Sequence, residues 1–171
     1  MTLDAMFGAA VTVPDVVARD AAAKIRDGAA FARYALLDRG SYDIDPLETP
    51  SAALVPVFST LVATAARITG RTTLAVTEAR LLRLLPGDYL LAHHDRLQDG
   101  NPVEVTADLS PAPVPGAEVH YRRRGQVFFR FPCVPGSVAV VERGPTVTCN
   151  HTYVSKLHAG ASVVRLVVLL R

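Results

Sequence analysis

A histidine and an aspartate two residues apart carry the clearest chemical signal in the chain. The stretch Leu85–Asp95 reads as a Pro-Gly turn and an apolar strand that ends in His93-His94-Asp95. Residues i and i+2 of a strand point to one face, so His93 and Asp95 are expected to project together. One imidazole and one carboxylate are two of the three ligands in the facial triad that binds non-haem Fe(II). A second histidine must then come from another strand.

Two later histidines could complete this ligand set. His151 lies in Thr146–Val154, whose alternation is typical of a strand, whereas His158 lies in a turn-like Leu-His-Ala-Gly segment. The strand context favours His151 as the distal ligand. The alternative pairs His158 with Arg171 as the anion binder, but Arg171 is the final residue of the chain, where the backbone tends to fray.

An arginine inside an apolar strand should meet an anion. Arg165 interrupts the apolar run Val163–Leu170, and a charge buried in a core strand costs several kcal/mol unless it is paired. Its planar guanidinium matches a carboxylate better than a lysine would.

Side-chain parity adds three residues to the expected pocket. Tyr89 shares the face of His93 by strict alternation, because 93 − 89 = 4, and Cys149 and Tyr153 share the face of His151. We expect Tyr89 to help bind whatever cofactor lies beside His93.

The elements that must position these residues are strands. After Gly70 the chain is a series of short Val-, Leu-, Phe- and Thr-rich runs separated by Pro-Gly, Asp-Gly and Arg-Gly turns. Without helical segments between them, these runs predict an antiparallel sandwich or jelly roll. The expected strands are Thr73–Leu85, Tyr89–His93, Val103–Leu109, Glu118–Arg123, Gln126–Phe131, Ser137–Glu142, Thr146–Val154 and Ser162–Leu170.

The first 70 residues have a different texture. Apolar residues at helical spacing predict helices over Pro14–Gly28 and Ser51–Ile68, each closed by a glycine. Phe31–Leu37 is mixed, and the Asp-, Gly- and Pro-rich stretch Gly40–Pro50 is expected to be a loop. The prediction is one domain over residues 1–171, mostly β (α+β), in which residues 1–70 form a helical buttress and residues 71–171 form the β core.

Composition excludes several classes of protein. The 171 residues carry a net charge of +2. An obligate nucleic-acid binder usually has a strongly basic face, so this class is not expected. The basic run Arg122–Arg124 is expected at a solvated hairpin tip, because Gly125 follows it. The sequence has no apolar run of about 20 residues, so a membrane span is not expected. It begins without the basic segment of a secretory signal, so secretion is not expected. Two cysteines without a CxxC pattern indicate reduced thiols in a cytoplasmic protein.

From Leu82 to the C-terminus the chain resembles the iron- and 2-oxoglutarate-dependent dioxygenases of the prolyl-hydroxylase type. The resemblance implies a double-stranded β-helix (jelly-roll) core that uses Fe(II), 2-oxoglutarate and O2. It implies metal ligation by His93, Asp95 and His151, and Arg165 on the cosubstrate carboxylate. Arg165 follows His151 by 165 − 151 = 14 residues, more than is usual in that family.

The expected activity is hydroxylation of an unactivated C–H bond in a small molecule, an amino acid, or a peptide or carrier-tethered substrate. The loops Gly40–Pro50, Arg96–Pro102 and Ser110–Pro115 are expected to recognise it. Two alternatives remain: a cupin-like metalloenzyme without a keto acid, and a non-catalytic β-sandwich binding module.

Overall fold

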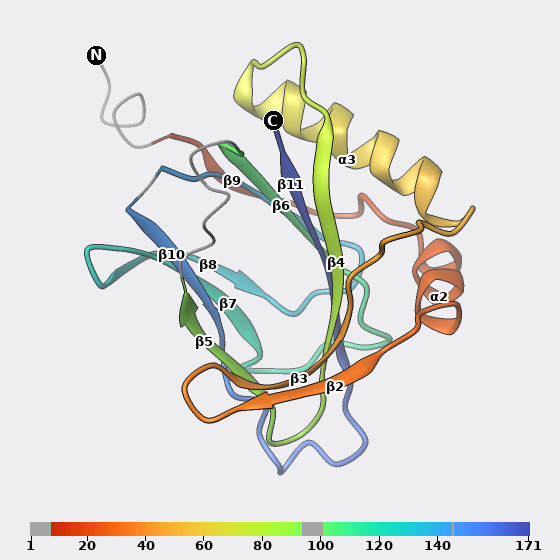
Figure 1. The fold of residues 1–171 in the computed structure, drawn as a ribbon, viewed down its shortest axis with the longest axis vertical. Coiled ribbons are helices and arrows are strands. Elements are labelled where there is room, and N and C mark those ends of the chain that lie inside the picture. The colour runs from red at the N-terminus through yellow and green to blue at the C-terminus, as the bar shows by residue number, and fades with distance from the viewer. Residues whose placement is uncertain (1–7, 94–100, 145) are drawn as a thin grey trace.

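The computed structural model describes residues 8–93, 101–144 and 146–171. Two helices and eleven strands make up the described fold (Figure 1). The helices are α2 (Arg19–Asp27) and α3 (Leu54–Thr69). The strands are β1 (Ala10–Val13), β2 (Ala32–Leu36), β3 (Gly40–Asp45), β4 (Val76–Leu84), β5 (Tyr89–His93), β6 (Val103–Asp108), β7 (Glu118–Arg123), β8 (Gln126–Pro132), β9 (Val138–Glu142), β10 (Val147–His151) and β11 (Val163–Leu170).

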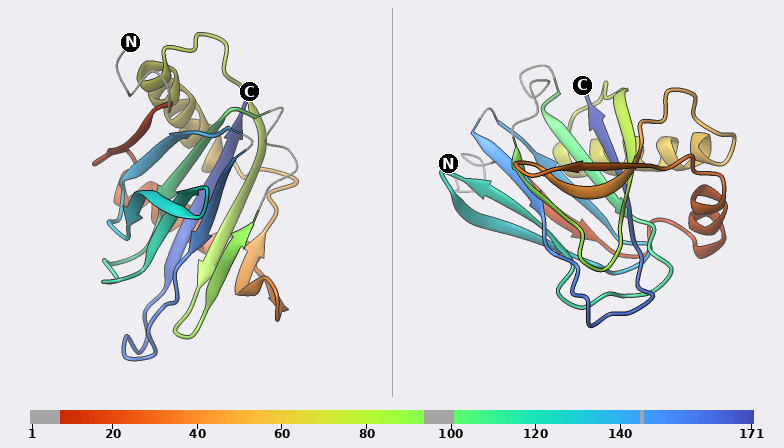
Figure 2. Two further views of the ribbon diagram at one scale, coloured as in Figure 1. Left: turned by 90° about the vertical axis from the view of Figure 1, so that its left-hand side faces the viewer. Right: turned by 60° about the horizontal axis from the view of Figure 1, so that its bottom comes forward.

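The strands form one antiparallel sheet that folds over on itself. Their order is β1-β9-β6-β11-β4-β3-β5-β10-β7-β8, with β2 paired to β3. The half that contains β9, β6, β11 and β4 faces the half that contains β5, β10, β7 and β8 (Figure 2). Apolar side chains from both halves pack between them, as Leu82 and Val167 do against Leu90. This is the nearly closed, jelly-roll arrangement expected of a double-stranded β-helix core.

Both helices cover the outer face of one half of the sheet. Leu54, Leu61 and Ala65 recur at helical spacing along α3 and pack in one cluster with β11 residues such as Leu166. Strand β11 is therefore buried on both faces over its whole length, which explains why its sequence is a continuous apolar run. Its even-numbered residues contact the helix layer, and Val163 and Val167 face the interior between the two halves.

The predicted helices and strands of the core are found, with changes at their ends. Gly70 closes α3 in the left-handed conformation, with φ +71°. Helix α2 begins at Arg19 rather than near Pro14, because the backbone N–H groups of Val16 and Val17 both bond to the Gly136 carbonyl, at 2.9 and 3.0 Å. This contact holds the preceding chain against the β8–β9 turn.

The expectation that residues 1–70 form only a helical buttress is wrong. They also contain β1 and the β2–β3 hairpin, so the stretch predicted as a loop from Gly40 is a strand as far as Asp45. Strand β3 bridges the two halves of the sheet: it pairs with β4 through Ile44 and with β5 through Gly40. Its sequence is mostly polar and every residue of β2 is exposed, so the apolar alternation that marks a strand is missing.

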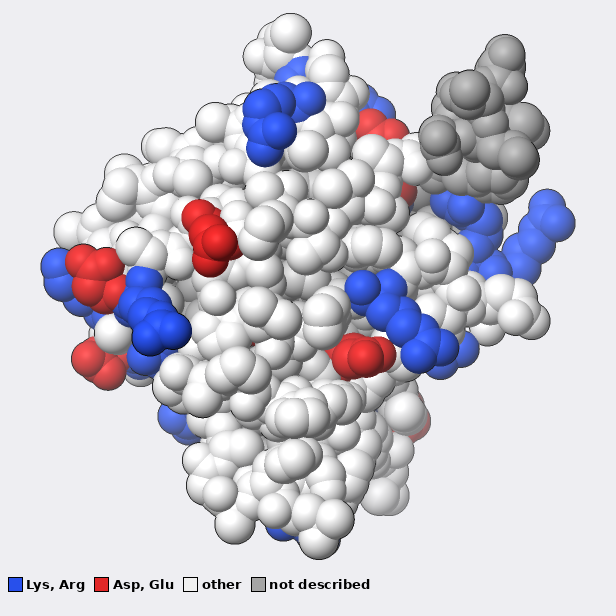
Figure 3. All heavy atoms as spheres, turned by 180° about the vertical axis from the view of Figure 1, so that it is seen from behind, with Lys and Arg blue, Asp and Glu red and all other residues white. Residues whose placement is uncertain are grey.

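One surface feature confirms a prediction from the sequence, the hairpin turn after β7. A two-residue turn of Arg124 and Gly125, with φ +51° and +76°, joins β7 to β8 where a hairpin tip was predicted. On the face drawn in Figure 3, small groups of basic and acidic side chains alternate with uncharged surface. No helix among the described residues is long and apolar enough to cross a membrane.

Candidate active site inside the barrel

The candidate site is built on β5 and its neighbour β10. His93 is the last residue of β5, and its Cα partner across the strand pair is Cys149. Cys149 is in turn the partner of Tyr121 on β7. Asp95, the second predicted ligand, lies outside the described residues. The fold thus places His93 in a row with Cys149 and Tyr121, at the end of β5.

His151 lies in a different row of the same strands. Its partners are Leu90 on β5 and Val119 on β7. The register shifts between the two rows, so that three steps along β5, from Leu90 to His93, match two steps along β10. Such a bulge breaks the period of two in one strand.

This irregularity affects the interpretation of Tyr89. The parity that pairs Tyr89 with His93 assumes unbroken alternation, which the shift interrupts. Leu90, not Tyr89, belongs to the apolar cluster between the two halves of the sheet. Tyr89 is half-buried beside Ser41 of β3, and the role predicted for it near a cofactor stays a prediction.

The two residues predicted from separate strands, His151 and Arg165, meet in the interior. Their side chains are almost fully buried, with 3% and 1% of each residue exposed. The Nη1 atom of Arg165 lies 3.0 Å from Nδ1 of His151. A guanidinium has no acceptor, so Nδ1 of His151 must be the unprotonated acceptor of this hydrogen bond. In a neutral ring the proton then resides on Nε2.

Arg165 is a buried cation that forms no ion pair with the residues the structure describes. Its Nη2 donates to the Ala117 carbonyl at 2.9 Å, and its Nε has no hydrogen-bond partner among the described residues. The carboxylate with the largest effect on the charge of Arg165 is that of Asp108, its Cα partner on β6. Asp108 Oδ1 accepts from Ser110 N at 2.8 Å, and its Oδ2 has no partner among the described residues. Burial lowers the pKa of Arg165, and the charge of Asp108 opposes that shift. A guanidinium remains charged even so, and the free Nε edge can bind a carboxylate.

A second buried charge contacts the row of His93 through Tyr121, and it is not predicted from the sequence. Glu104 of β6, 1% exposed, accepts a hydrogen bond from the Tyr121 hydroxyl at 2.8 Å and is ion-paired with Arg143. Arg143 also donates to the Val147 carbonyl at 3.2 Å, at the start of β10. This network ties β10 to β6, two residues before Cys149. Burial, with the charge of Glu104 as the next cause, raises the pKa of Tyr121 well above its ordinary value.

The sequence offered a weak signal for this pair. Glu104 is the polar member of an alternating strand, which on its own is typical of a solvent-facing residue. Only the fold shows that both faces of β6 are covered.

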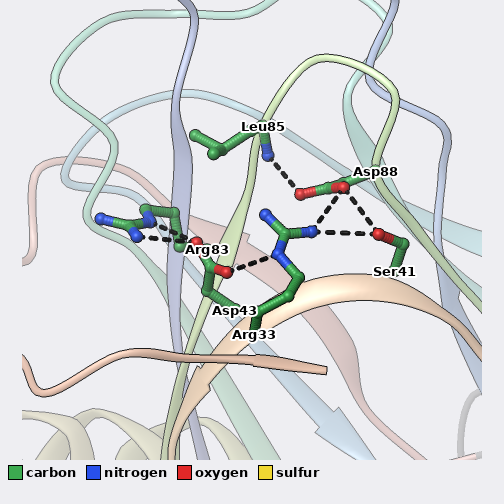
Figure 4. Close-up of polar contacts among 6 residues, drawn as sticks. All are labelled: Arg33, Ser41, Asp43, Arg83, Leu85 and Asp88. Atoms are coloured by element: carbon green, nitrogen blue, oxygen red, sulfur yellow. Dashed lines mark hydrogen bonds and ion pairs between the residues drawn. The ribbon is translucent and has the colours of Figure 1, made fainter. Parts of the chain in front are cut away.

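A polar network also fixes the start of β5 (Figure 4). Asp88, 6% exposed, accepts from Arg33 Nη1 at 2.8 Å, from Ser41 Oγ at 3.0 Å and from Leu85 N at 2.9 Å. Arg33 joins it to Asp43, which also binds Arg83. All these oxygens have partners, so we assign the network to structure: it holds the β4–β5 turn against β3 and so sets where β5 ends.

The remaining predicted residues lie outside this interior. His158 is half-buried in the turn between β10 and β11, Arg171 is exposed at the end of the chain, and Tyr153 is 52% exposed. The loop 110–115 lines, with α2, a hollow of about 620 Å³ on the helix side of the sheet. The loop 96–102 falls mostly outside the described residues.

The interior fits a carboxylate better than it fits a metal on His151. A histidine that ligates a metal donates its other ring N–H to an acceptor, whereas Nδ1 of His151 faces a cationic donor. Among the described residues, which exclude Asp95 and the side chain of His93, no three His, Cys, Asp or Glu side chains form a group that could hold a metal. Arg165, by contrast, is a buried cation whose Nε–H has no partner in the part of the chain that the structure describes.

Comparison with known proteins identifies the fold. No family profile and no curated protein matches the sequence. The structure resembles a prolyl-4-hydroxylase from Pseudomonas putida, with TM-score 0.72 and 17% identity over 98% of this chain and 94% of that one. It also resembles HygX from Streptomyces hygroscopicus, solved with nickel and 2-oxoglutarate bound, with TM-score 0.70 and 11% identity over 98% and 84%.

A third similar structure is that of an epimerase, not of a hydroxylase. The α-ketoglutarate-dependent epimerase SnoN from nogalamycin biosynthesis matches with TM-score 0.72 and 12% identity, over 98% of this chain and 77% of that one. The chain therefore has the double-stranded β-helix fold of the 2OG-Fe(II) oxygenases.

Proposed function

We propose that this protein is an Fe(II)- and 2-oxoglutarate-dependent oxygenase. The observation that carries the proposal is Arg165, a guanidinium 1% exposed inside the barrel, with no carboxylate of the described residues in an ion pair with it. Such a group is costly unless an anion joins it. The fold supports the proposal, since solved structures that share it have 2-oxoglutarate bound.

The predicted roles divide between the two rows of the barrel. His93 and Asp95 would hold the metal at the end of β5, with a third ligand from β10 or from the turn after it. His151 remains the residue predicted for that place and His158 the alternative. The bound metal would supply the oxidation of a substrate C–H bond by O2, coupled to decarboxylation of 2-oxoglutarate to succinate.

Arg165 would bind the distal carboxylate of 2-oxoglutarate. The low dielectric of the interior strengthens its attraction for an anion, and its position on β11 is rigid because both faces of that strand are packed. Hydroxylation is the reaction we propose, on a small molecule, an amino acid or a peptide. In it one oxygen atom enters the substrate and the other enters succinate, with release of CO2.

The test measures succinate formed from 2-oxoglutarate with Fe(II) and O2. We expect turnover in the wild type, loss in Asp95→Ala and Arg165→Ala, and wild-type turnover in Arg130→Ala, an exposed arginine on β8. Unchanged turnover in the first two variants would refute the assignment. Metal binding without 2-oxoglutarate binding would favour a cupin-like metalloenzyme, and absence of both would favour a binding module.

A further inference from the structure

We infer that His151 belongs to the carboxylate site, where it positions Arg165, and that it is not a ligand of the metal. The inference rests on the proposed function for the identity of the anion, 2-oxoglutarate. It replaces the role that the sequence predicts for His151. Two observations carry it: which ring nitrogen of His151 holds the proton, and the register of β10 against β5.

The proton argument concerns the two ring nitrogens. Nδ1 of His151 accepts the hydrogen bond from Arg165 at 3.0 Å, so it offers no lone pair to a metal while that bond exists. The neutral ring then carries its proton on Nε2. A metal at Nε2 would require the ring proton to move to Nδ1, which would break the hydrogen bond from Arg165 and set two N–H groups against each other, or to leave the ring as an imidazolate. Ligating histidines show the reverse arrangement, with the second nitrogen as donor.

The register argument concerns position along β10. The residue opposite His93 is Cys149, and His151 lies opposite Leu90. Strands rise about 3.3 Å per residue, so the Cα of His151 is displaced by roughly 7 Å from the row of His93. The displacement is toward Arg165, whose side chain spans from β11 to the carbonyl of Ala117.

The neighbours of Arg165 explain what a histidine contributes here. Its Nη1 and Nη2 bond to two neutral acceptors, an imidazole and a carbonyl. Neutral acceptors fix the plane of the guanidinium and leave its charge uncancelled. A carboxylate in their place would cancel that charge. Nε has no partner among the described residues, so its N–H is left for a ligand of the delocalised cation. His151 thus pre-orients the cation that the anion needs.

Two substitutions separate this role from metal ligation. His151→Asn keeps an oxygen close to the place of Nδ1 but has no atom at the place of Nε2. His151→Leu has no acceptor at all. Affinity is measured first for Mn(II) alone, then for 2-oxoglutarate in the Mn(II)-loaded protein. We expect both variants to bind Mn(II) within about twofold of the wild type, and His151→Leu to lose about tenfold or more in 2-oxoglutarate affinity. His151→Asn should retain most of it.

Either of two results would overturn the inference. A loss of Mn(II) affinity in His151→Asn of the size that removal of a ligand causes would make His151 a ligand. Unchanged 2-oxoglutarate affinity in His151→Leu would reduce it to core packing.

If the wild type bound no Mn(II), the proposed function would be refuted and the affinity test above could not be applied. A measurement that needs no metal then tests the inference. Nitrogen-15 NMR of the imidazole, assigned with His151→Asn, should show a neutral ring with its proton on Nε2. That proton should redistribute in Arg165→Met. A proton on Nδ1 in the wild type would overturn the inference.

Discussion

Two buried arginines in this barrel should lose stability to different extents on the same substitution. Arg143 and Arg165 are 4% and 1% exposed. Arg143 is ion-paired with the buried carboxylate of Glu104, whereas the hydrogen-bond partners of Arg165 among the described residues are a histidine and a carbonyl. Methionine replaces the guanidinium by an unbranched apolar group in each case. The pair therefore compares an arginine that has a direct ion pair with one that has only the more distant charge of Asp108.

The magnitudes follow from what each substitution leaves behind. Arg143→Met strands the charge of Glu104 in the interior, which costs about 3–5 kcal/mol. Arg165→Met strands two neutral acceptors, at roughly 1–3 kcal/mol each, but removes a cation whose burial costs several kcal/mol. The two terms for Arg165 offset each other, so we expect its variant to lie within about 2 kcal/mol of the wild type.

Urea unfolding followed by circular dichroism measures both effects, with Arg130→Met on the exposed face of β8 as the control. Because a domain of this size is stable by about 5–15 kcal/mol, the Arg143 variant should still fold. Saturating 2-oxoglutarate should then stabilise the wild type, by about 2.7 kcal/mol at one hundred times its dissociation constant, and leave Arg165→Met unchanged. A larger loss of stability in Arg165→Met than in Arg143→Met would refute the view that Arg165 is held without a counter-charge.

Two further predictions concern the networks around the site. Tyr121→Phe should reduce the loss of stability at alkaline pH: burial holds the pKa of Tyr121 well above 10.0 in the folded protein, so only the unfolded chain releases this proton above pH 10. The free energy of unfolding then falls by about 1.4 kcal/mol per pH unit for this group; unfolding curves of both proteins from pH 9 to 11 measure it, and parallel curves would contradict the prediction. Asp88→Asn should weaken the contacts with Arg33 and with the backbone of Leu85, and so lower the free energy of unfolding by about 1–3 kcal/mol. It should also reduce the affinity for Mn(II), because the end of β5 is then less well fixed. An unchanged Mn(II) affinity would show that this network does not affect the site.

Much of the fold was predictable because its core strands are apolar and its turns use glycine and proline. The end of β5 at His93 and the hairpin turn at Arg124 follow from local chemistry. Strand β3 was not predictable, since it is held by backbone pairing on both sides and carries few apolar residues. The ion pair of Glu104 and Arg143 joins residues 39 apart, and no local pattern marks one as the partner of the other.

The sequence by itself determined that a histidine ends one strand and that an arginine lies in the middle of another apolar one. The reason is physical: hydrophobic runs must be buried, and a charge inside them must find a partner. Only the tertiary structure decided which residues meet. The shift between β5 and β10 places Cys149 opposite His93 and directs His151 to Arg165, because register depends on pairing between strands and not on spacing along either one.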